Sequence, residues 1–152
     1  MFDFRFLNNA FWTIDTRYNI CYIKTLGMED ADAIIEKYDV ITNSSNWNSK
    51  TVLVNDYEEL EGVKLLTADI SRISDFHEKI INRLGSGDWY FITSSMLYYG
   101  IIRIYASYVN YYAGPTVHPV KRLKDIKDDL IVSTIKRCRI SLTKKINEKP
   151  RR

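Results

Sequence analysis

The residues of this sequence that could perform chemistry are two adjacent serines, two histidines and a run of carboxylates. Ser94 and Ser95 follow a short apolar strand, predicted at 89–93, and precede a helix. The nucleophilic serine of an α/β-hydrolase sits at such a turn, which requires flanking glycines because its backbone is strained. Thr93 and Leu97 stand in those places. Nucleophilic catalysis is therefore not expected. The pair is interpreted as a helix N-cap, with anion binding by the free amides of the helix start as an alternative.

The two histidines do not form a metal site or an acid–base site with their neighbours in the sequence. Neither His77 nor His118 has a cysteine, a second histidine or a paired carboxylate at the spacing of metal ligands. Cys21 and Cys138 are far apart in the sequence and are interpreted as two reduced thiols. We therefore predict no metal, no cofactor and no catalytic residue, in a cytoplasmic protein.

A run of carboxylates after a predicted strand at 51–55 gives the one argument for an enzyme. The carboxyl edge of a parallel sheet is where open α/β proteins place their active sites. The acidic residues are Asp56, Glu58, Glu59 and Glu61. Because this run contains no basic partner, a solvated connector at 56–62 is the favoured interpretation. The protein is predicted not to be an enzyme.

The composition is that of one globular domain with an uneven distribution of charge. The chain has 152 residues, of which 45% are hydrophobic and 27% charged. Its longest apolar run, 96–102, is too short to span a bilayer, and no secretion signal is recognised at the N-terminus. Residues 136–152 contain eight Lys or Arg and one acid. We predict a domain at 1–140 and a basic tail at 141–152, which is expected either to fold back on an acidic surface of the domain or to make weak contact with anionic surfaces. No aromatic residue follows Tyr112, so sequence-specific binding of nucleic acid is not expected.

Hydrophobic periodicity predicts the order β-β-α-β-α-β-α-β-α, a mixed sheet that is parallel apart from one strand, with helices packed on it. The expected strands are a hairpin at 11–15 and 19–25, with an additional edge strand at 2–7, and single strands at 51–55, 89–93 and 116–120. The helices are expected at 29–41, at 67–84, from 96 onwards, and from 123 onwards.

The helix after Ser95 is rich in tyrosine, and its apolar residues occupy more than one face. Spacing of 100° per residue predicts a stripe facing the sheet that consists of Ile101, Ile104, Tyr105 and Tyr108. The aromatic residues outside this stripe favour a partner surface or a ligand groove, because tyrosine is enriched at interfaces. Gly100 is unfavourable inside a helix, which indicates that another backbone approaches it closely.

The second half of the chain resembles the SpoIIAA-like (STAS) superfold, including the bacterial STAS and CRAL-TRIO-related proteins. The features that carry the resemblance are a strand at Trp89–Thr93, the Ser94-Ser95 turn, the Tyr99-Gly100 pair, Arg103-Ile104-Tyr105, a last strand at Val117–Val120, and an acidic helix from Leu123 to Leu130. As a pattern of elements, the resemblance extends over about 11–140. One departure concerns the phosphorylated antagonists of the family, which carry an Asp-Ser-Ser-Gly type motif. Residues 64–69 read KLLTAD in this region, so no phosphorylation site is carried over.

The resemblance implies a non-enzymatic binding or regulatory module. Its expected contact with a protein partner is the surface formed by Ser94, Ser95, Tyr98, Tyr99 and Arg103. The alternative is a carrier of a small apolar or lipidic ligand, held in a pocket under the tyrosine-rich helix. Association into a homodimer is a further alternative.

Overall fold

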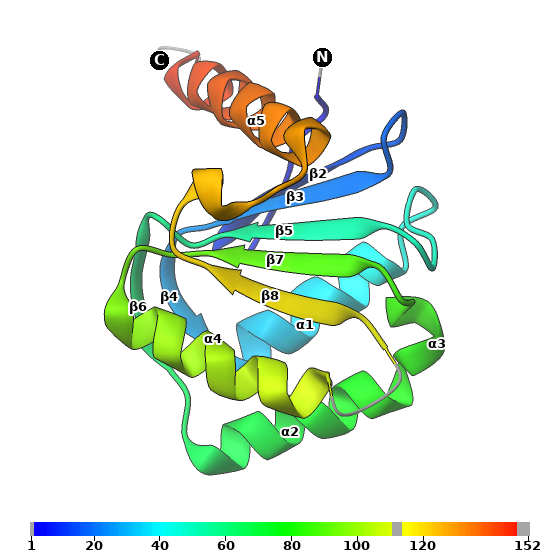
Figure 1. The fold of residues 1–152 in the computed structure, drawn as a ribbon, viewed down its shortest axis with the longest axis vertical. Coiled ribbons are helices and arrows are strands. Elements are labelled where there is room, and N and C mark those ends of the chain that lie inside the picture. The colour runs from blue at the N-terminus through cyan, green and yellow to red at the C-terminus, as the bar shows by residue number, and fades with distance from the viewer. Residues whose placement is uncertain (1, 111–113, 149–152) are drawn as a thin grey trace.

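The computed structural model describes residues 2–110 and 114–148, so that Tyr111, Tyr112 and the end of the predicted tail lie outside the described residues. Figure 1 shows one large sheet with helices on both of its faces. Its strands, in spatial order, are β1 (Arg5–Leu7), β2 (Ala10–Asp15), β3 (Ile20–Thr25), β5 (Val52–Asp56), β7 (Asp88–Ile92) and β8 (Thr116–Val120).

The sheet is parallel except for β2, which runs antiparallel to both of its neighbours. This strand order, together with the helices on both faces, confirms the predicted mixed, mostly parallel α/β fold. Pro119 lies in β8, which is the edge strand, where a residue without an N–H group does not interrupt a ladder.

A second sheet, which was not predicted, contains β4 (Gly27–Asp30) and β6 (Leu60–Lys64) paired in parallel. Residues 56–62 were expected to be a solvated connector, which is wrong for both ends of this range, because Asp56 belongs to β5 and residues 60–62 belong to β6. β6 contains Gly62 and two charged residues, so its own sequence favours a strand weakly. Its conformation depends on β4, a partner about thirty residues away that local periodicity does not reveal.

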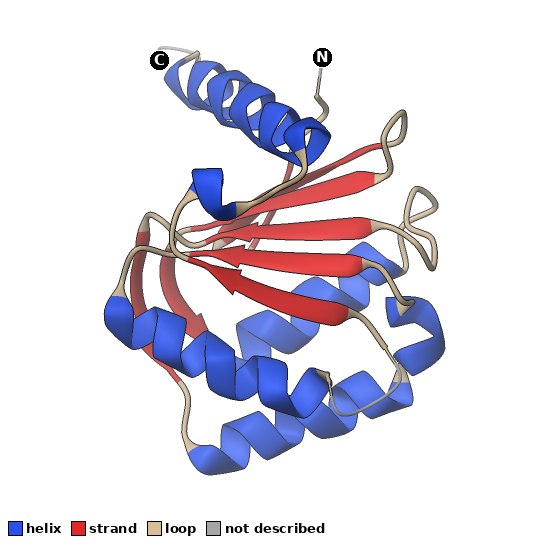
Figure 2. Cartoon of the chain, in the orientation of Figure 1, coloured by secondary structure: helices blue, strands red, loops and turns tan. Residues whose placement is uncertain are grey.

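The helices divide unequally between the two faces of the large sheet, as Figure 2 shows. One face carries α1 (Ala31–Thr42), α2 (Thr67–Lys79), the short α3 (Ile81–Leu84) and α4 (Met96–Val109). The other face is covered by α5 (Asp129–Asn147), which follows a 3₁₀ turn at Leu123–Asp125. Because both faces are covered, the central strands β3, β5 and β7 consist largely of buried aliphatic and aromatic residues.

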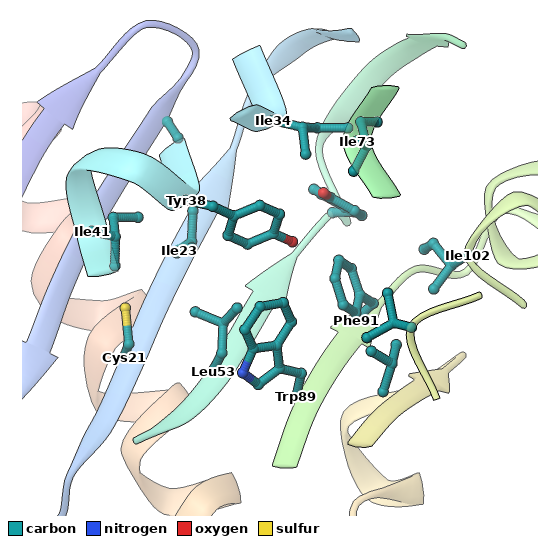
Figure 3. Close-up of a cluster of buried hydrophobic side chains, with 14 of the residues drawn as sticks. Cys21, Ile23, Ile34, Tyr38, Ile41, Leu53, Ile73, Trp89, Phe91 and Ile102 are labelled. Atoms are coloured by element: carbon teal, nitrogen blue, oxygen red, sulfur yellow. The ribbon is translucent and has the colours of Figure 1, made fainter. Parts of the chain in front are cut away.

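Two hydrophobic clusters fill the spaces between the sheet and these helices. In the larger one, shown in Figure 3, Trp89 is fully buried and stacks on Tyr38 with ring centroids 5.1 Å apart. Leu53 of β5 and Ile73 of α2 belong to the same cluster. The smaller cluster lies between the sheet and α5. Each helix therefore contributes to one of two separate cores.

Helix α5 crosses the predicted boundary between domain and tail at residue 140. It continues to Asn147, and Leu142 in its last third belongs to the smaller core. Nearby, Lys145 Nζ donates a hydrogen bond to the backbone oxygen of Phe4 at 2.7 Å. The first part of the basic segment 141–152 is thus packed against the sheet.

Leu142→Ala should lower the free energy of unfolding by about 2–5 kcal/mol, since Leu142 is 1% exposed and the substitution leaves a cavity. Leu130→Ala, in the same helix at a residue that is 44% exposed, is the matched control and should cost less than about 1 kcal/mol. Urea unfolding followed by circular dichroism measures both. Equal effects would show that the end of α5 does not contribute to the core.

Candidate functional site

The turn between β7 and α4 is organised by hydroxyl groups, as expected of a helix N-cap. Ser95 Oγ accepts a hydrogen bond from the backbone N–H of Tyr98 at 3.3 Å, and Thr93 Oγ1 accepts one from the N–H of Ser95 at 3.2 Å. The exposed Ser94 donates to Glu58 Oε2 at 3.0 Å. The interpretation of Ser95 as an N-cap is confirmed. Each of these three hydroxyl groups therefore has a hydrogen-bond partner within the fold.

The other three residues of the predicted contact surface lie on the first two turns of α4. Tyr98 donates from its hydroxyl to the backbone oxygen of Glu61 in β6, at 3.0 Å, and so links α4 to the small sheet. Tyr99 is half-buried, with Lys121 Nζ 5.0 Å from the centroid of its ring. Arg103 is exposed. Of the predicted set, Ser94, Tyr99 and Arg103 are therefore accessible, whereas Ser95 and Tyr98 support the fold.

Helix α4 is rotated relative to the predicted stripe, of which Ile101 and Tyr105 do face the space beneath the helix. Its buried residues are Ile102, Ala106 and Val109, while Ile104 and Tyr108 of the predicted inner stripe are exposed. Apolar residues occur on every side of this helix, so periodicity alone could not select the inner face. The result is an outer face of α4 that is largely apolar, formed by Met96, Leu97, Ile104 and Tyr108. We call these four residues the α4 outer face.

Gly100 lies within α4 without a close neighbour in the described part of the chain. A Cβ atom added there would meet no other heavy atom within 4 Å. The predicted close contact between Gly100 and another backbone is therefore not made by any of the described residues.

The space beneath α4 is lined by apolar and aromatic side chains but is small. It measures about 40 Å³, and Tyr57, Phe91, Tyr98 and Tyr105 are among its lining residues. Sites for small organic ligands are commonly about 300–1,000 Å³, and about 30 Å³ is one water molecule's share of liquid volume. This particular space is therefore smaller than a typical site for a small organic ligand.

A buried ion pair that sequence analysis missed lies next to this space. Lys37 Nζ of α1 is 2.5 Å from Glu29 Oε2 of β4, and both side chains are almost inaccessible to water. Thr25 Oγ1 accepts from the same ammonium at 3.2 Å, and the Tyr57 hydroxyl donates to Glu29 at 2.9 Å. Burial lowers the pKa of Lys37, an effect that Glu29 opposes. Lys37 falls on the apolar stripe that includes Ile34 and Ile41, and a lysine in that position was the available signal.

His77 lies inside the larger core, on the side that faces α4. Its Nε2 atom lies 2.9 Å from the hydroxyl of Tyr105, and Tyr38 packs edge-on against its ring. Burial lowers the pKa of His77 to about 4, so the imidazole is neutral at physiological pH. Because its side chain is buried and touches Tyr105, His77 is a core residue in contact with α4.

The carboxylates considered for an enzyme do not form a free cluster. Asp56 is fully buried, accepting from Arg139 Nε at 2.8 Å and from the Tyr22 hydroxyl at 2.5 Å. Burial alone would raise the pKa of Asp56, but these hydrogen bonds outweigh it and hold the pKa below its ordinary value. Glu59 pairs with Lys24 at 3.0 Å. Among residues 2–110 and 114–148, no group of three or more His, Cys, Asp or Glu could hold a metal ion.

Comparison with known proteins gives a fold neighbour and no family. No family model matches the sequence, and no curated protein matches it. The solved structures that match include an uncharacterized protein from the DUF3478 family with a SpoIIAA-like fold, from Shewanella loihica PV-4. It is 15% identical, with a TM-score of 0.44, and the match covers 82% of this chain and 88% of that chain. The fold assignment itself rests on the strand order and helical layers described above.

None of the described helices is long and apolar enough to cross a membrane.

Stability should fall between pH 6.5 and pH 4 because His77 is buried. The unfolded chain takes up a proton near pH 6.5, whereas the folded protein does so only near pH 4. Stability is therefore retained above the unfolded pKa and lost as the pH falls, by up to about 3 kcal/mol at pH 4.

The measurement compares the unfolding free energies of the wild type and His77→Gln at pH 8, 6 and 4. The variant is expected to have a smaller loss on acidification, although it starts from a lower stability because the contact with Tyr105 is removed. The values at pH 8, where an unperturbed imidazole is neutral, provide the baseline. Parallel curves for the two proteins would show that His77 is not the responsible group.

Proposed function

We propose that this protein is a non-catalytic binding module that contacts a protein partner through the α4 outer face, together with Ser94, Tyr99 and Arg103. The observation that carries this proposal is the composition of α4, which is apolar on its inner and outer faces yet lies at the surface (Figure 1). A helix that is hydrophobic all round is normally buried. An exposed apolar face of this kind is typical of a contact site for another protein.

Gly100 supports the same surface. It lies in α4 between Leu97 and Ile104, so its missing side chain leaves a notch within the apolar face. Glycine costs about 1 kcal/mol relative to alanine inside a helix. A partner whose backbone approaches this notch would account for a residue that has no such neighbour among those described.

The charge of the surface indicates the complementary chemistry of the partner. Arg103 is the single charged residue in α4, and Lys121 lies over Tyr99 beside the helix start. We therefore expect a partner that offers apolar side chains flanked by acidic ones. Such charge complementarity favours correct orientation more than affinity.

Ile104→Asp is expected to abolish partner association, because it places a charge in the centre of an apolar contact. The matched control is Ile140→Asp on α5, which makes the same change at another exposed helical isoleucine; the two residues are 51% and 60% exposed. Both variants should keep the wild-type free energy of unfolding within about 1 kcal/mol, as is usual at exposed positions.

Site-specific photo-crosslinking in the native host measures the association directly. A photoreactive phenylalanine analogue at position 108 should give discrete adducts that disappear with Ile104→Asp and persist with Ile140→Asp. Mass spectrometry of the adduct separates a different protein from a second copy of this chain. The proposal is contradicted if the photoreactive analogue gives no discrete adduct at position 97 or at position 108. It is also contradicted if Ile104→Asp and Ile140→Asp reduce the adduct yield equally.

Gly100→Ala should act in opposite directions on folding and on association. Alanine has open space at this position and should stabilise the helix by up to about 1 kcal/mol, which raises Tm by about 2–4 °C. The added methyl group should at the same time weaken the photo-crosslinked adduct. A more stable protein with unchanged adduct yield would show that the notch is not part of the contact.

A further inference from the structure

A cavity of about 390 Å³ lies far from α4, along the edge of β2. β1 covers β2 only from Ala10 to Trp12, so the edge from Thr13 to Asp15 is left without a neighbouring strand. Segments distant in sequence enclose this space, namely the N-terminal residues 2–5, the β2 hairpin, the loop after α1, and α5. Figure 1 shows the N-terminal segment and α5 side by side at the end of the sheet that carries β2.

Three arginines from three of these segments line the cavity. Arg5 Cζ lies 5.6 Å from the ring of Trp12, and Arg17 Cζ lies 4.4 Å from the ring of Tyr18. Arg137 of α5 lies 5.6 Å from the same Tyr18 ring. Two guanidinium groups that share one aromatic ring are held near each other despite their like charge.

The hydrogen-bonding capacity of these arginines is largely unused. Within the described ranges, none of the three donates a side-chain hydrogen bond to a carboxylate, and Arg137 donates to Thr134 Oγ1 at 3.1 Å. Arg83, by contrast, is held by Asp39 at 2.7 Å. A guanidinium group that stacks on an aromatic ring leaves the N–H donors at its edge available for hydrogen bonds. Two of these donors can bind two oxygen atoms of one phosphate group at the same time.

A buried carboxylate in the same cavity has a free acceptor. The Asp15 side chain is 8% exposed, and its Oδ1 atom accepts from the backbone N–H of Arg17 at 3.1 Å. Its Oδ2 atom accepts no hydrogen bond from the described residues and forms only a long ion pair with Arg17 Nη2, at 3.9 Å. A buried carboxylate oxygen without a donor is costly, so this atom indicates that a donor group is supplied from outside.

We propose that this cavity binds a small phosphorylated polyol of the sugar-phosphate class. The phosphate would lie against Arg17 and Arg137, and a hydroxyl group of the ligand would donate to Asp15 Oδ2. Asp3 also lines the cavity, so three arginines face two aspartates and the net charge favours an anion. Further hydroxyl and amide groups are offered by Thr13, Thr16, Ser44 and Asn46. The volume is within the range of about 300–1,000 Å³ that is common for small-molecule sites.

Isothermal titration calorimetry of the full chain with ribose 5-phosphate, ribose and inorganic phosphate tests the proposal. Ribose 5-phosphate should bind more tightly than either fragment. Arg17→Gln and Arg137→Gln should each weaken its binding by at least about tenfold, the usual effect of losing a charge-assisted hydrogen bond. Arg122→Gln is the control, because Arg122 and Arg17 have equal side-chain exposure, 63%, and Arg122 is not a cavity residue.

Asp15→Asn separates the two halves of the site. Removing the negative charge should strengthen binding of inorganic phosphate and reduce the preference for ribose 5-phosphate over phosphate. Equal affinity of the wild type for phosphate and ribose 5-phosphate would overturn the role of Asp15. Three outcomes would overturn the proposal as a whole. The protein would not be saturated by millimolar ribose 5-phosphate, or Arg17→Gln and Arg122→Gln would weaken binding equally, or only a polyglutamate peptide would saturate the protein.

Discussion

A lysine and a glutamate, each 2% exposed, hold together the elements on which the surface of α4 depends. Lys37 comes from α1 and Glu29 from β4, while Thr25 at the end of β3 and Tyr57 after β5 complete their hydrogen bonds. Loss of either charge would leave the other buried and unpaired, at a cost of about 3–5 kcal/mol. This requirement fixes the position of β4 beside the large sheet, although β4 and β6 are too short to form a stable sheet alone.

The small sheet in turn determines how α4 is presented. β6 pairs with β4, and the backbone oxygen of Glu61 in β6 accepts a hydrogen bond from the hydroxyl of Tyr98 in the first turn of α4. Tyr105, two turns later, contacts His77 of α2. The hydroxyl groups of Tyr98 and Tyr105 are thus used on the inner side of α4. The aliphatic residues and Tyr108 are left on the exposed side, which gives this tyrosine-rich helix a largely apolar outer face.

Signals that are local in sequence predicted much of this fold, and those that require a distant partner did not. Ser95 as a cap follows from the chemistry of a single residue, and the strand at 116–120 follows from local periodicity. β6 was missed because its conformation depends on β4, and the inner face of α4 was assigned wrongly because apolar residues surround the helix. Of the predicted contact residues, Ser94 and Arg103 are exposed and Tyr99 is half-buried, whereas Ile104, which was expected on the inner stripe of α4, is exposed.

The basic character of the C-terminal segment has a similar explanation. From the sequence, its charges were expected to belong to a tail that either folds back on an acidic surface or contacts an anionic partner. In the fold, Arg139 neutralises the buried Asp56, Lys145 binds the backbone of Phe4, and Arg137 faces the cavity beside β2. These cations are distributed around α5, so a run of positive charge in sequence becomes three separate interactions in space. In the described part of the segment, positive charge therefore serves the packing of a helix that covers one face of the sheet, as Arg139 and Lys145 show.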